Sequence, residues 1–469
     1  MERNLRWFRW HQLVAGALFW APTTFLYLIA RFGLSTALQA QVVYYVAVVV
    51  LEVPSGWFSD RFGRVLTLRT VAVAWVGAHA LFLTEPGFAG IAVAQVMLAA
   101  GYAFLSGSDT TFHLETLECV GRADEYHDRE AAVRRVLLWS GAASALVGGA
   151  LGTIDLRLPF AAALLAAAVQ FVLALRLTEP PVVDAGANDP GGLVAGIGHL
   201  RTPLLGWITA FVGVSVVSAH LAADLAAPYL TEVLDTDPEA PGAAALLNGA
   251  VAAVVAAVAA VALHIVVPTG RRFGPVRTLL LLLVVPVVIL MAMAGVTSLW
   301  LLPLMTIRRL PSAAVSVFAP PLVAGFVGPR SRATFLSMAS FIGRLAYAGV
   351  LLALSTIDDD LGRTLTIGAA IAGGSWLAVA LAARRIRPWP TELGHGHEHA
   401  HVPIGHEHHH SHGDGHHDHD HDHLDDSGSD GDGHLHVHDH EGTHHSHPHL
   451  RDAHHGHDHD DGHDAGPGR

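Results

Sequence analysis

The chain has 469 residues, of which 51% are hydrophobic and 15% charged, with a mean hydropathy of +0.40 and a formal net charge of −13. This balance is typical of a polytopic membrane protein and excludes an ordinary soluble domain. Cys119 is the only cysteine, which excludes an intramolecular disulfide and a thiolate metal cluster. The acidic charge is concentrated in residues 391–469, which hold 27 of the 34 histidines, 18 acidic residues and two arginines. Removing this net charge of −16 leaves the rest of the chain at about +3.

Apolar runs of about 20 residues, the length that crosses a bilayer, recur along the chain. They predict twelve membrane helices, at 11–32, 37–57, 65–84, 88–111, 134–154, 157–177, 204–230, 242–267, 277–296, 299–326, 333–356 and 362–382. The first run is too long for the core of a signal peptide, so we expect it to remain in the protein. Residues 178–203 are rich in Pro, Gly, Asp and Ala, which predicts a polar linker between two six-helix bundles.

The predicted fold class is therefore an all-α polytopic membrane protein. Its expected parts are an N-terminal bundle (1–177), a cytoplasmic linker (178–203), a C-terminal bundle (204–389) and a tail (390–469). With the N-terminus inside, the cytoplasmic segments hold 19 arginines and the outer loops hold three, as the positive-inside rule requires. An even number of helices then places both termini in the cytoplasm and the protein in the inner, cytoplasmic membrane.

A charged turn lies between the second and third predicted helices. Residues 56–64 read Gly-Trp-Phe-Ser-Asp-Arg-Phe-Gly-Arg, a G-x-x-x-D-R-x-G-R pattern. In this position the pattern resembles the loop signature of the major facilitator superfamily. Arg272-Phe-Gly274 follows Arg61-Phe-Gly63 after 211 residues, with Arg271 in place of the aspartate. A repeated loop of this kind is expected of a transporter built from two similar bundles.

The resemblance implies a transporter of twelve helices and a role for the motif in holding the two bundles together on the cytoplasmic side. This role would fall to Asp60, Arg61 and Arg64, with Gly56 and Gly63 in the same motif. A carboxylate at the N-terminus of a neighbouring helix is favoured by the helix dipole, and breaking such a contact can bias a carrier with two states. The alternative is a simple connector, whose glycines permit the bend and whose arginines lie in water.

Two pairs of ionisable residues fall within predicted membrane helices, where charge is costly and therefore indicates function. Asp109 and His113 lie four residues apart on the fourth helix, and His220 and Asp224 four apart on the seventh. The resemblance implies that both helices line a central cavity, and carboxylate with imidazole suits a divalent cation. At 1.5 Å per residue, Asp109 lies about 30 Å from the outer end of its helix and His220 about 24 Å from the inner end of its own. We therefore expect two separate binding sites along the path, or none. The alternative for Asp109 and His113 is that they cap the helix in interfacial water.

Further charges lie in the second, tenth and eleventh predicted helices. Glu52 is a candidate proton carrier, because gaining or losing a proton changes the cost of burying a carboxylate. Arg344 is expected to neutralise a buried carboxylate, and Arg308 and Arg309 are the other intramembrane cations. The alternative for Glu52 is a structural ion pair with a loop arginine.

The tail lacks any apolar period and is dense in His, Gly and Asp, which predicts a disordered segment. Neutral imidazoles beside carboxylates are ligands for Ni²⁺, Zn²⁺, Co²⁺ or Cu²⁺, and without thiolates they favour multiple exchangeable sites. The alternatives are a purification tag and a solubilising acidic tail. The candidate metal ligands are His395, His397, His399, His408, His409, His410, His416, His417, His419, His421, His423, His434, His436, His438 and His440.

Carriers of this superfamily with histidine-rich C-termini resemble nickel-resistance exporters. That resemblance implies proton-coupled export of Ni²⁺, Co²⁺ or Zn²⁺, captured by the tail. A second hypothesis is proton-driven efflux of an organic drug or metabolite, dependent on aromatic residues such as Trp20, Tyr27 and Tyr44, with the tail as a metal buffer. A third is a membrane-bound metal sensor or store. The expected partners are the bilayer, protons and a small solute, for a monomer that needs no cofactor, binds no nucleic acid and is not an enzyme.

Overall fold

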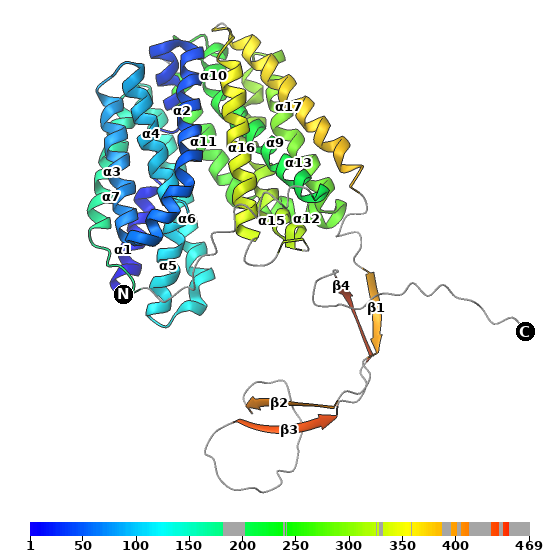
Figure 1. Ribbon diagram of the computed structural model, residues 1–469. Helices are drawn as coiled ribbons and strands as arrows, with labels where there is room; N and C mark the ends of the chain where they lie inside the picture. The colour runs from blue at the N-terminus through cyan, green and yellow to red at the C-terminus, as the bar shows by residue number, and fades with distance from the viewer. Residues whose placement is uncertain are drawn as a thin grey trace, which may run out of the picture. The chain divides into compact units, whose positions relative to one another are not determined.

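The computed structural model describes residues 1–181, 202–237, 240, 242–324, 326–327, 332–357 and 359–386, together with four short segments of the tail. The chain divides into two compact units, Met1–Arg387 and Pro388–Arg469. In the described part of the first unit, all regular structure is helical (Figure 1).

The first unit contains two sets of helices, one before and one after residues 182–201. The first half consists of α1 (Glu2–Ala15), α2 (Thr24–Phe62), α3 (Arg64–Leu83), α4 (Phe88–Leu105), α5 (Ser108–Cys119), the short η1 (Ala123–Glu125), α6 (Tyr126–Gly152) and α7 (Leu158–Ala174). The second half consists of α9 (Pro203–Asp224), α10 (Ala226–Val233), α11 (Ala243–Val261), α12 (Leu263–Phe273), α13 (Pro275–Gly295), η2 (Leu299–Leu301), α14 (Leu302–Thr306), α15 (Leu310–Ala324), α16 (Arg332–Leu354) and α17 (Leu361–Ala383).

When the described helices are judged by length and composition, fewer than the twelve predicted membrane spans are found. Among the described residues, nine helical stretches are long and apolar enough to cross a membrane, or ten if the bent pair α11 and α12 forms one span. The first predicted helix is divided between α1 and the start of α2. Gly33, with φ 77° and ψ 170°, is not helical, so α2 consists of two helices that meet at a kink, and this kink lies between the first and second predicted helices. With 17 residues, α7 is apolar but shorter than any of these nine stretches. Twelve spans therefore remain a prediction.

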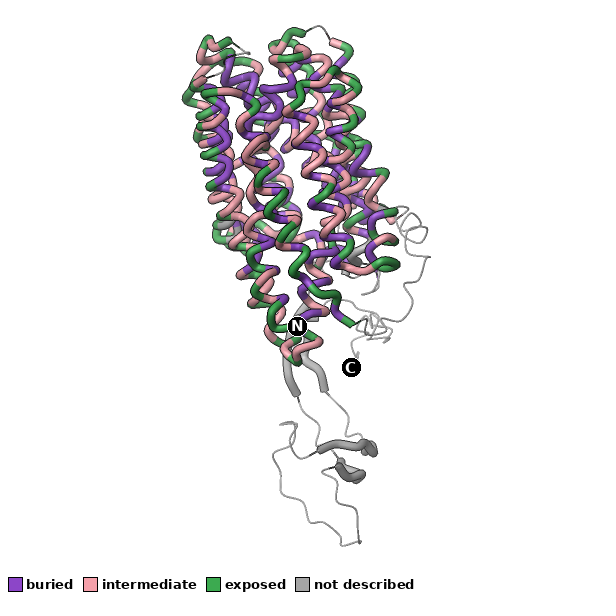
Figure 2. Tube along the Cα trace, turned by 90° about the vertical axis from the view of Figure 1, so that its left-hand side faces the viewer, coloured by how far each residue is buried: buried purple, intermediate pink, exposed green. Residues whose placement is uncertain are grey.

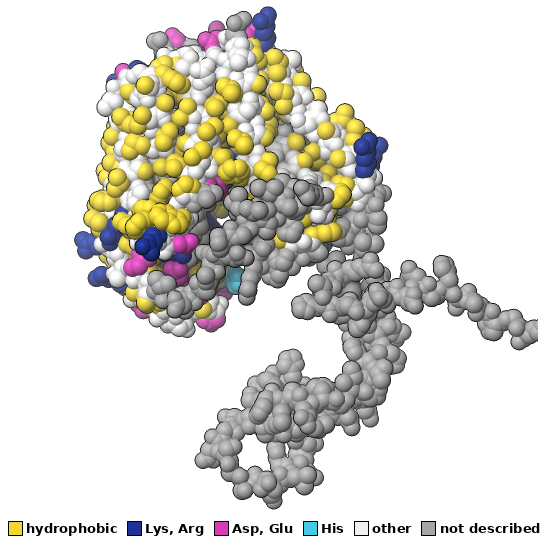
Figure 3. All heavy atoms as spheres, viewed as in Figure 1, with side chains coloured by type: hydrophobic (Ala, Val, Ile, Leu, Met, Phe, Trp, Pro, Cys, Tyr) yellow, Lys and Arg dark blue, Asp and Glu magenta, His cyan; other side chains and the backbone are white. Residues whose placement is uncertain are grey.

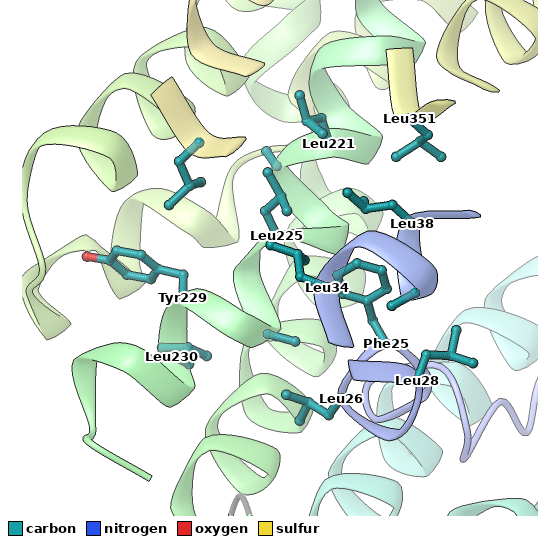
Figure 4. Close-up of a cluster of buried hydrophobic side chains, with 14 of the residues drawn as sticks. Phe25, Leu26, Leu28, Leu34, Leu38, Leu221, Leu225, Tyr229, Leu230 and Leu351 are labelled. Atoms are coloured by element: carbon teal, nitrogen blue, oxygen red, sulfur yellow. The ribbon is translucent and has the colours of Figure 1, made fainter. Parts of the chain in front are cut away.

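The halves pack against each other along two pairs of helices, α2 with α16 and α6 with α11 (Figure 1). Figure 4 shows the apolar cluster they share, in which Phe25, Leu28 and Leu38 of α2 meet Leu221 of α9 and Leu351 of α16. Each of these five side chains is at most 5% exposed. Because lipid tails are as apolar as leucine, close packing of side chains holds such helices together.

The outer surface of the helical unit is apolar. Large side chains such as Val50, Trp139 and Leu165 are 62%, 65% and 68% exposed. In Figure 2 buried and exposed positions alternate along the helices, and in Figure 3 apolar side chains cover the middle of the visible face, with most charges toward its ends. A polar backbone paired within helices beneath an apolar surface is what a bilayer requires. The chain is thus a multi-pass membrane protein.

Two glycines allow α6 and α11 to approach closely. A Cβ atom at Gly249 would lie 2.6 Å from the carbonyl oxygen of Ala145 and 2.8 Å from the Cα of Gly149. We expect Gly249→Val to force the two helices apart and to lower the free energy of unfolding by about 1 to 3 kcal/mol, the usual effect of overpacking. Thermal unfolding of the purified protein measures this. Gly374→Val is the matched control, because no atom lies within 4 Å of a Cβ there, and equal melting temperatures would contradict the expected contact.

The four described tail segments form two antiparallel strand pairs, β1 (His395–Ala400) with β4 (His444–His449) and β2 (Gly405–Ser411) with β3 (Gly433–Asp439). In β1 and β3 every second residue is a histidine, which matches the period of two of an extended strand, whereas β2 has three consecutive histidines, His408, His409 and His410. The disorder predicted for the tail as a whole remains a prediction. The remaining candidate tail ligands, His416, His417, His419, His421, His423 and His440, lie outside the described residues.

Candidate substrate cavity

A cavity of about 680 Å³ lies between the two halves of the helical unit. Its volume is in the range of small-molecule sites. Residues of both halves line it, and most of them are aromatic, polar or charged. The polar and aromatic lining residues are Trp20, Thr24, Phe25, Gln41, Tyr44, Tyr45, Glu52, Gln95, Tyr102, Ser106, Asp109, Arg134, His220, Asp224, Asn248, Arg309 and Arg344.

An ion pair joins the two halves inside this cavity. Nη1 of Arg344 on α16 lies 2.8 Å from Oε2 of Glu52 on α2, and both side chains line the cavity. Arg344 thus pairs with a carboxylate, although Glu52 is 22% exposed and only partly buried. In the described contacts Glu52 pairs with Arg344, whereas the loop arginine Arg64 binds Asp60 and Glu115.

The halves are joined again toward the end of the helices that carries Ser35, here called the Ser35 end. The backbone N–H of Ser35 donates to Oδ1 of Asp359 at 2.7 Å, and its hydroxyl donates to the carbonyl of Ser355. Nδ2 of Asn248 donates to the carbonyl of Pro22. These hydrogen bonds and the ion pair of Glu52 with Arg344 join the halves at mid-depth and toward the Ser35 end.

His220 and Asp224 form a polar cluster with two tyrosines. The hydroxyl of Tyr347 donates to Oδ2 of Asp224 at 2.7 Å. Nδ1 of His220 lies 2.9 Å from the carbonyl of Val216, which can only accept, so Nδ1 carries a proton and Nε2 keeps a free lone pair when the ring is neutral. The ring of Tyr45 contacts the rings of His220 and Tyr347 edge-on, with distances between ring centroids of 5.7 and 4.8 Å. Tyr45 thereby brings α2 of the first half into the cluster.

Asp109 belongs to a buried network and not to an interfacial cap. The predicted fourth helix breaks at Gly107, where φ is 80°, and Asp109 lies in the first turn of α5, where the helix dipole favours a carboxylate. Its Oδ2 accepts from Gln12 at 3.1 Å and from Arg134 at 3.2 Å, and Asp109 is 4% exposed. The burial excludes the predicted alternative of capping in interfacial water for this residue.

His113 takes a different partner from Asp109. Its Nδ1 lies 2.7 Å from Oε2 of Glu130 on α6, and Arg134 donates to the other oxygen of Glu130 at the same distance. His113 does not line the cavity, whereas Asp109, His220 and Asp224 do. Within the described ranges, no three His, Cys, Asp or Glu side chains are placed to hold a metal ion.

The charged turn is organised within the first half. Gly63 has a φ of 95° and a ψ of 158°, a conformation that a side chain would strain. Arg64 binds Asp60 at 2.6 Å and Glu115 at 3.4 Å. The carboxylate of Glu179 accepts the backbone N–H groups of Arg64 and Val65, at 2.6 and 2.7 Å, so Glu179 occupies the N-terminus of α3. The role of Asp60 in holding the bundles together remains a prediction. Arg61 and Gly56 are exposed.

Sequence reasoning missed Glu179 and Glu130 as partners of these residues. Glu179 follows α7 and lies 115 residues from Arg64, and Glu130 lies in a charged stretch before the apolar part of α6. No local spacing indicates either contact, because each depends on how distant helices pack. Of the three aromatic residues predicted to contact an organic solute, Trp20 and Tyr44 line the cavity. Tyr27 does not: it is 2% exposed, and its hydroxyl donates to the carbonyl of Phe82.

Replacing Glu179 by alanine is expected to destabilise the start of α3. Two backbone N–H groups would lose a charged acceptor, which corresponds to about 1 to 2 kcal/mol for a cap of this kind. The expected result is a lower melting temperature of the purified protein. Glu118→Ala is the matched control, since Glu118 is an exposed glutamate of the neighbouring helix. Equal effects of both substitutions would contradict the capping role.

The fold is shared with solved membrane transporters. The nucleoside transporter NupG aligns with a TM-score of 0.67 at 14% identity, over 82% of this chain and 100% of that one. A bacterial homologue of the iron transporter ferroportin, in an inward-facing state, aligns with a TM-score of 0.60 at 15% identity, over 81% and 99%. A D-xylose-proton symporter aligns with a TM-score of 0.58 at 14% identity, over 81% and 97%. No family model and no curated protein matches the sequence.

These likenesses show that the chain shares the fold of these solved transporters. Because one fold serves many functions, the shared fold does not by itself identify the activity of this chain.

Proposed function

We propose that this protein is a proton-coupled secondary transporter that exports a small organic solute across the cytoplasmic membrane. The observation that carries this proposal is the chemistry of the cavity. Trp20, Tyr44 and Tyr102 line it, and aromatic walls with a few polar groups are typical of sites for organic ligands. Two of its three carboxylates, Glu52 and Asp109, are within 3.2 Å of an arginine. Such carboxylates are less available to a divalent cation.

Export of Ni²⁺, Co²⁺ or Zn²⁺ is the second candidate, and the tail favours it. Its 27 histidines among 18 acidic residues offer many ligands of the type these ions prefer. In this mechanism the tail binds the metal in the cytoplasm and raises its concentration beside the transporter. The arginine distribution supports this orientation, with both termini in the cytoplasm. A monomer suffices for either candidate, since the cavity lies within one chain.

The experiment uses inside-out vesicles with an imposed proton gradient, containing either the full-length protein or a version ending at Pro390. Uptake of Ni²⁺, Co²⁺ and Zn²⁺ is measured beside uptake of small aromatic probes such as benzoate, benzamide and benzylamine. Gradient-dependent uptake of an organic probe by both versions supports the first candidate. Uptake of metal alone, weaker after truncation, would replace it with the second. Metal binding by the tail with no flux of any solute would indicate a sensor or store and contradict both.

A further inference from the structure

Arg309 lies at a break in a membrane-spanning segment. The span Leu299–Val323 contains α14 and α15, separated by a turn at residues 307–309. Pro311, near the start of α15, has no N–H to donate to the carbonyl of residue 307, which favours the break between the two helices at this point. Arg309 is ten residues into the span, or about 15 Å at 1.5 Å per residue, which is near mid-depth. Its side chain is exposed and lines the cavity.

The other charges of the cavity already have partners. Glu52 binds Arg344 at 2.8 Å, and Asp109 binds Arg134 at 3.2 Å. Asp224 accepts a hydrogen bond from Tyr347. Among the described residues, the guanidinium of Arg309 has no hydrogen bond and no carboxylate within 4 Å. The positive charge of the cavity that is left without a partner is therefore that of Arg309.

The neighbour of Arg309 does not relieve this charge but adds to it. Arg308 is 9% exposed, and its Nη1 donates only to the carbonyl of Met305, at 3.4 Å. Two adjacent guanidinium groups at mid-depth raise the local positive potential. Ionisable side chains that face a cavity at this depth mark substrate paths, so an arginine kept there without a protein partner indicates that a partner arrives with the solute. A divalent cation would be repelled at this position.

We propose that the transported solute carries an anionic group, a carboxylate or a phosphate, that binds Arg309, and an aromatic or apolar body that packs against Trp20, Tyr44 and Tyr102. The planar guanidinium offers two parallel N–H donors, which match either oxyanion. This inference rests on the proposed function of an organic-solute transporter and names the class of its substrate. A cation with the same body lacks the group that Arg309 would bind.

The test compares four probes of similar size on the purified full-length protein: benzoate, phenyl phosphate, benzamide and benzylamine. Binding is measured by isothermal titration calorimetry. We expect at least one of the two anions to bind at least about tenfold more tightly than benzamide and benzylamine, and the tighter anion identifies carboxylate or phosphate as the preferred group. Arg309→Gln is expected to remove this preference, and Arg309→Lys to keep part of it. Arg384→Gln, an exposed arginine beyond α17, is the matched control and should bind like the unaltered protein.

Thermal unfolding of each variant verifies that it is folded, and Arg309→Lys keeps the test decisive if Arg309→Gln does not fold. Equal binding of benzoate, phenyl phosphate and benzamide would overturn the inference, as would an anion preference that survives Arg309→Gln or no binding of either anion at 10 mM. Gradient-driven uptake of benzylamine or benzamide without uptake of either anion would overturn it while leaving the proposed organic-solute transporter intact. Uptake of Ni²⁺ alone would reject both.

Discussion

Asp224→Asn is expected to lower proton-driven accumulation of solute by at least about 100-fold, which corresponds to about 2.7 kcal/mol. Asp224 lines the cavity beside the Tyr347 hydroxyl, and in the described part of the chain it has no ion-pair partner within 4 Å. Glu52 and Asp109 each have an arginine within 3.2 Å. Protonation changes the cost of burial most for a carboxylate without a fixed counter-charge. Asparagine has nearly the same shape but cannot carry the proton.

The measurement is uptake of benzoate and of Ni²⁺ into proteoliposomes, each with and without an imposed proton gradient. Exchange of solute at equal concentrations on both sides needs no proton and should stay within about threefold of the unaltered protein. Asp155→Asn is the matched control, because Asp155 is a loop carboxylate whose pKa is lowered by hydrogen bonds from Arg157 and which lies outside the cavity. If Asp224→Asn still accumulates solute against the gradient, another group carries the proton.

Glu52→Gln is expected to open the Ser35 end of the transporter more often. The ion pair of Glu52 with Arg344 connects the two halves at 2.8 Å, with exposed fractions of 22% and 33% for the two side chains. Partial exposure screens such a pair, so we expect a change of about 1 to 3 kcal/mol, or roughly 5- to 150-fold, in the equilibrium between the observed state and one open at the Ser35 end. The shift requires that the pair be broken in that second state.

Cysteine labelling measures this equilibrium without knowledge of the solute. In a Cys119→Ser background, Ala37→Cys places a thiol in the apolar cluster shared by both halves, where Ala37 is 0% exposed. Labelling by a water-soluble maleimide should be at least about fivefold faster with Glu52→Gln or Arg344→Gln. The double variant should match the single ones, because the interaction is already lost. Glu85→Gln, which removes an ion pair with Arg31 inside the first half, is the control.

Unchanged labelling in both single variants would mean that the Glu52 and Arg344 pair persists in both states. The ion pair would then orient the two halves without changing the equilibrium between the two conformational states. Faster labelling with Glu85→Gln as well would indicate a general loosening of the protein, and the change could no longer be assigned to the contact between the halves.

Much of the membrane class of this protein follows from local features of its sequence. Apolar runs of about 20 residues at regular intervals require membrane burial wherever they pack, and the histidine-rich composition of the tail cannot form an apolar core. The turn predicted at residues 56–64 is shorter in the structure, where α2 continues to Phe62 and Gly63 alone separates it from α3. The exact number of spans was less accessible, because the kink at Gly33 and the break at Gly107 depend on the backbone angles of single glycines.

The partners of the charged residues were decided only by the tertiary structure. Glu52 and Arg344 are 292 residues apart, and Arg64 and Glu179 are 115 apart. Whether two such groups meet depends on the depth and rotation of each helix, which are set by close contacts such as that of Gly149 with Gly249. For the same reason the sequence shows that Arg309 lies in a membrane helix but not that it lacks a partner. That fact emerges only when Glu52 and Asp109 are seen to pair with other arginines and Asp224 to accept a hydrogen bond from Tyr347.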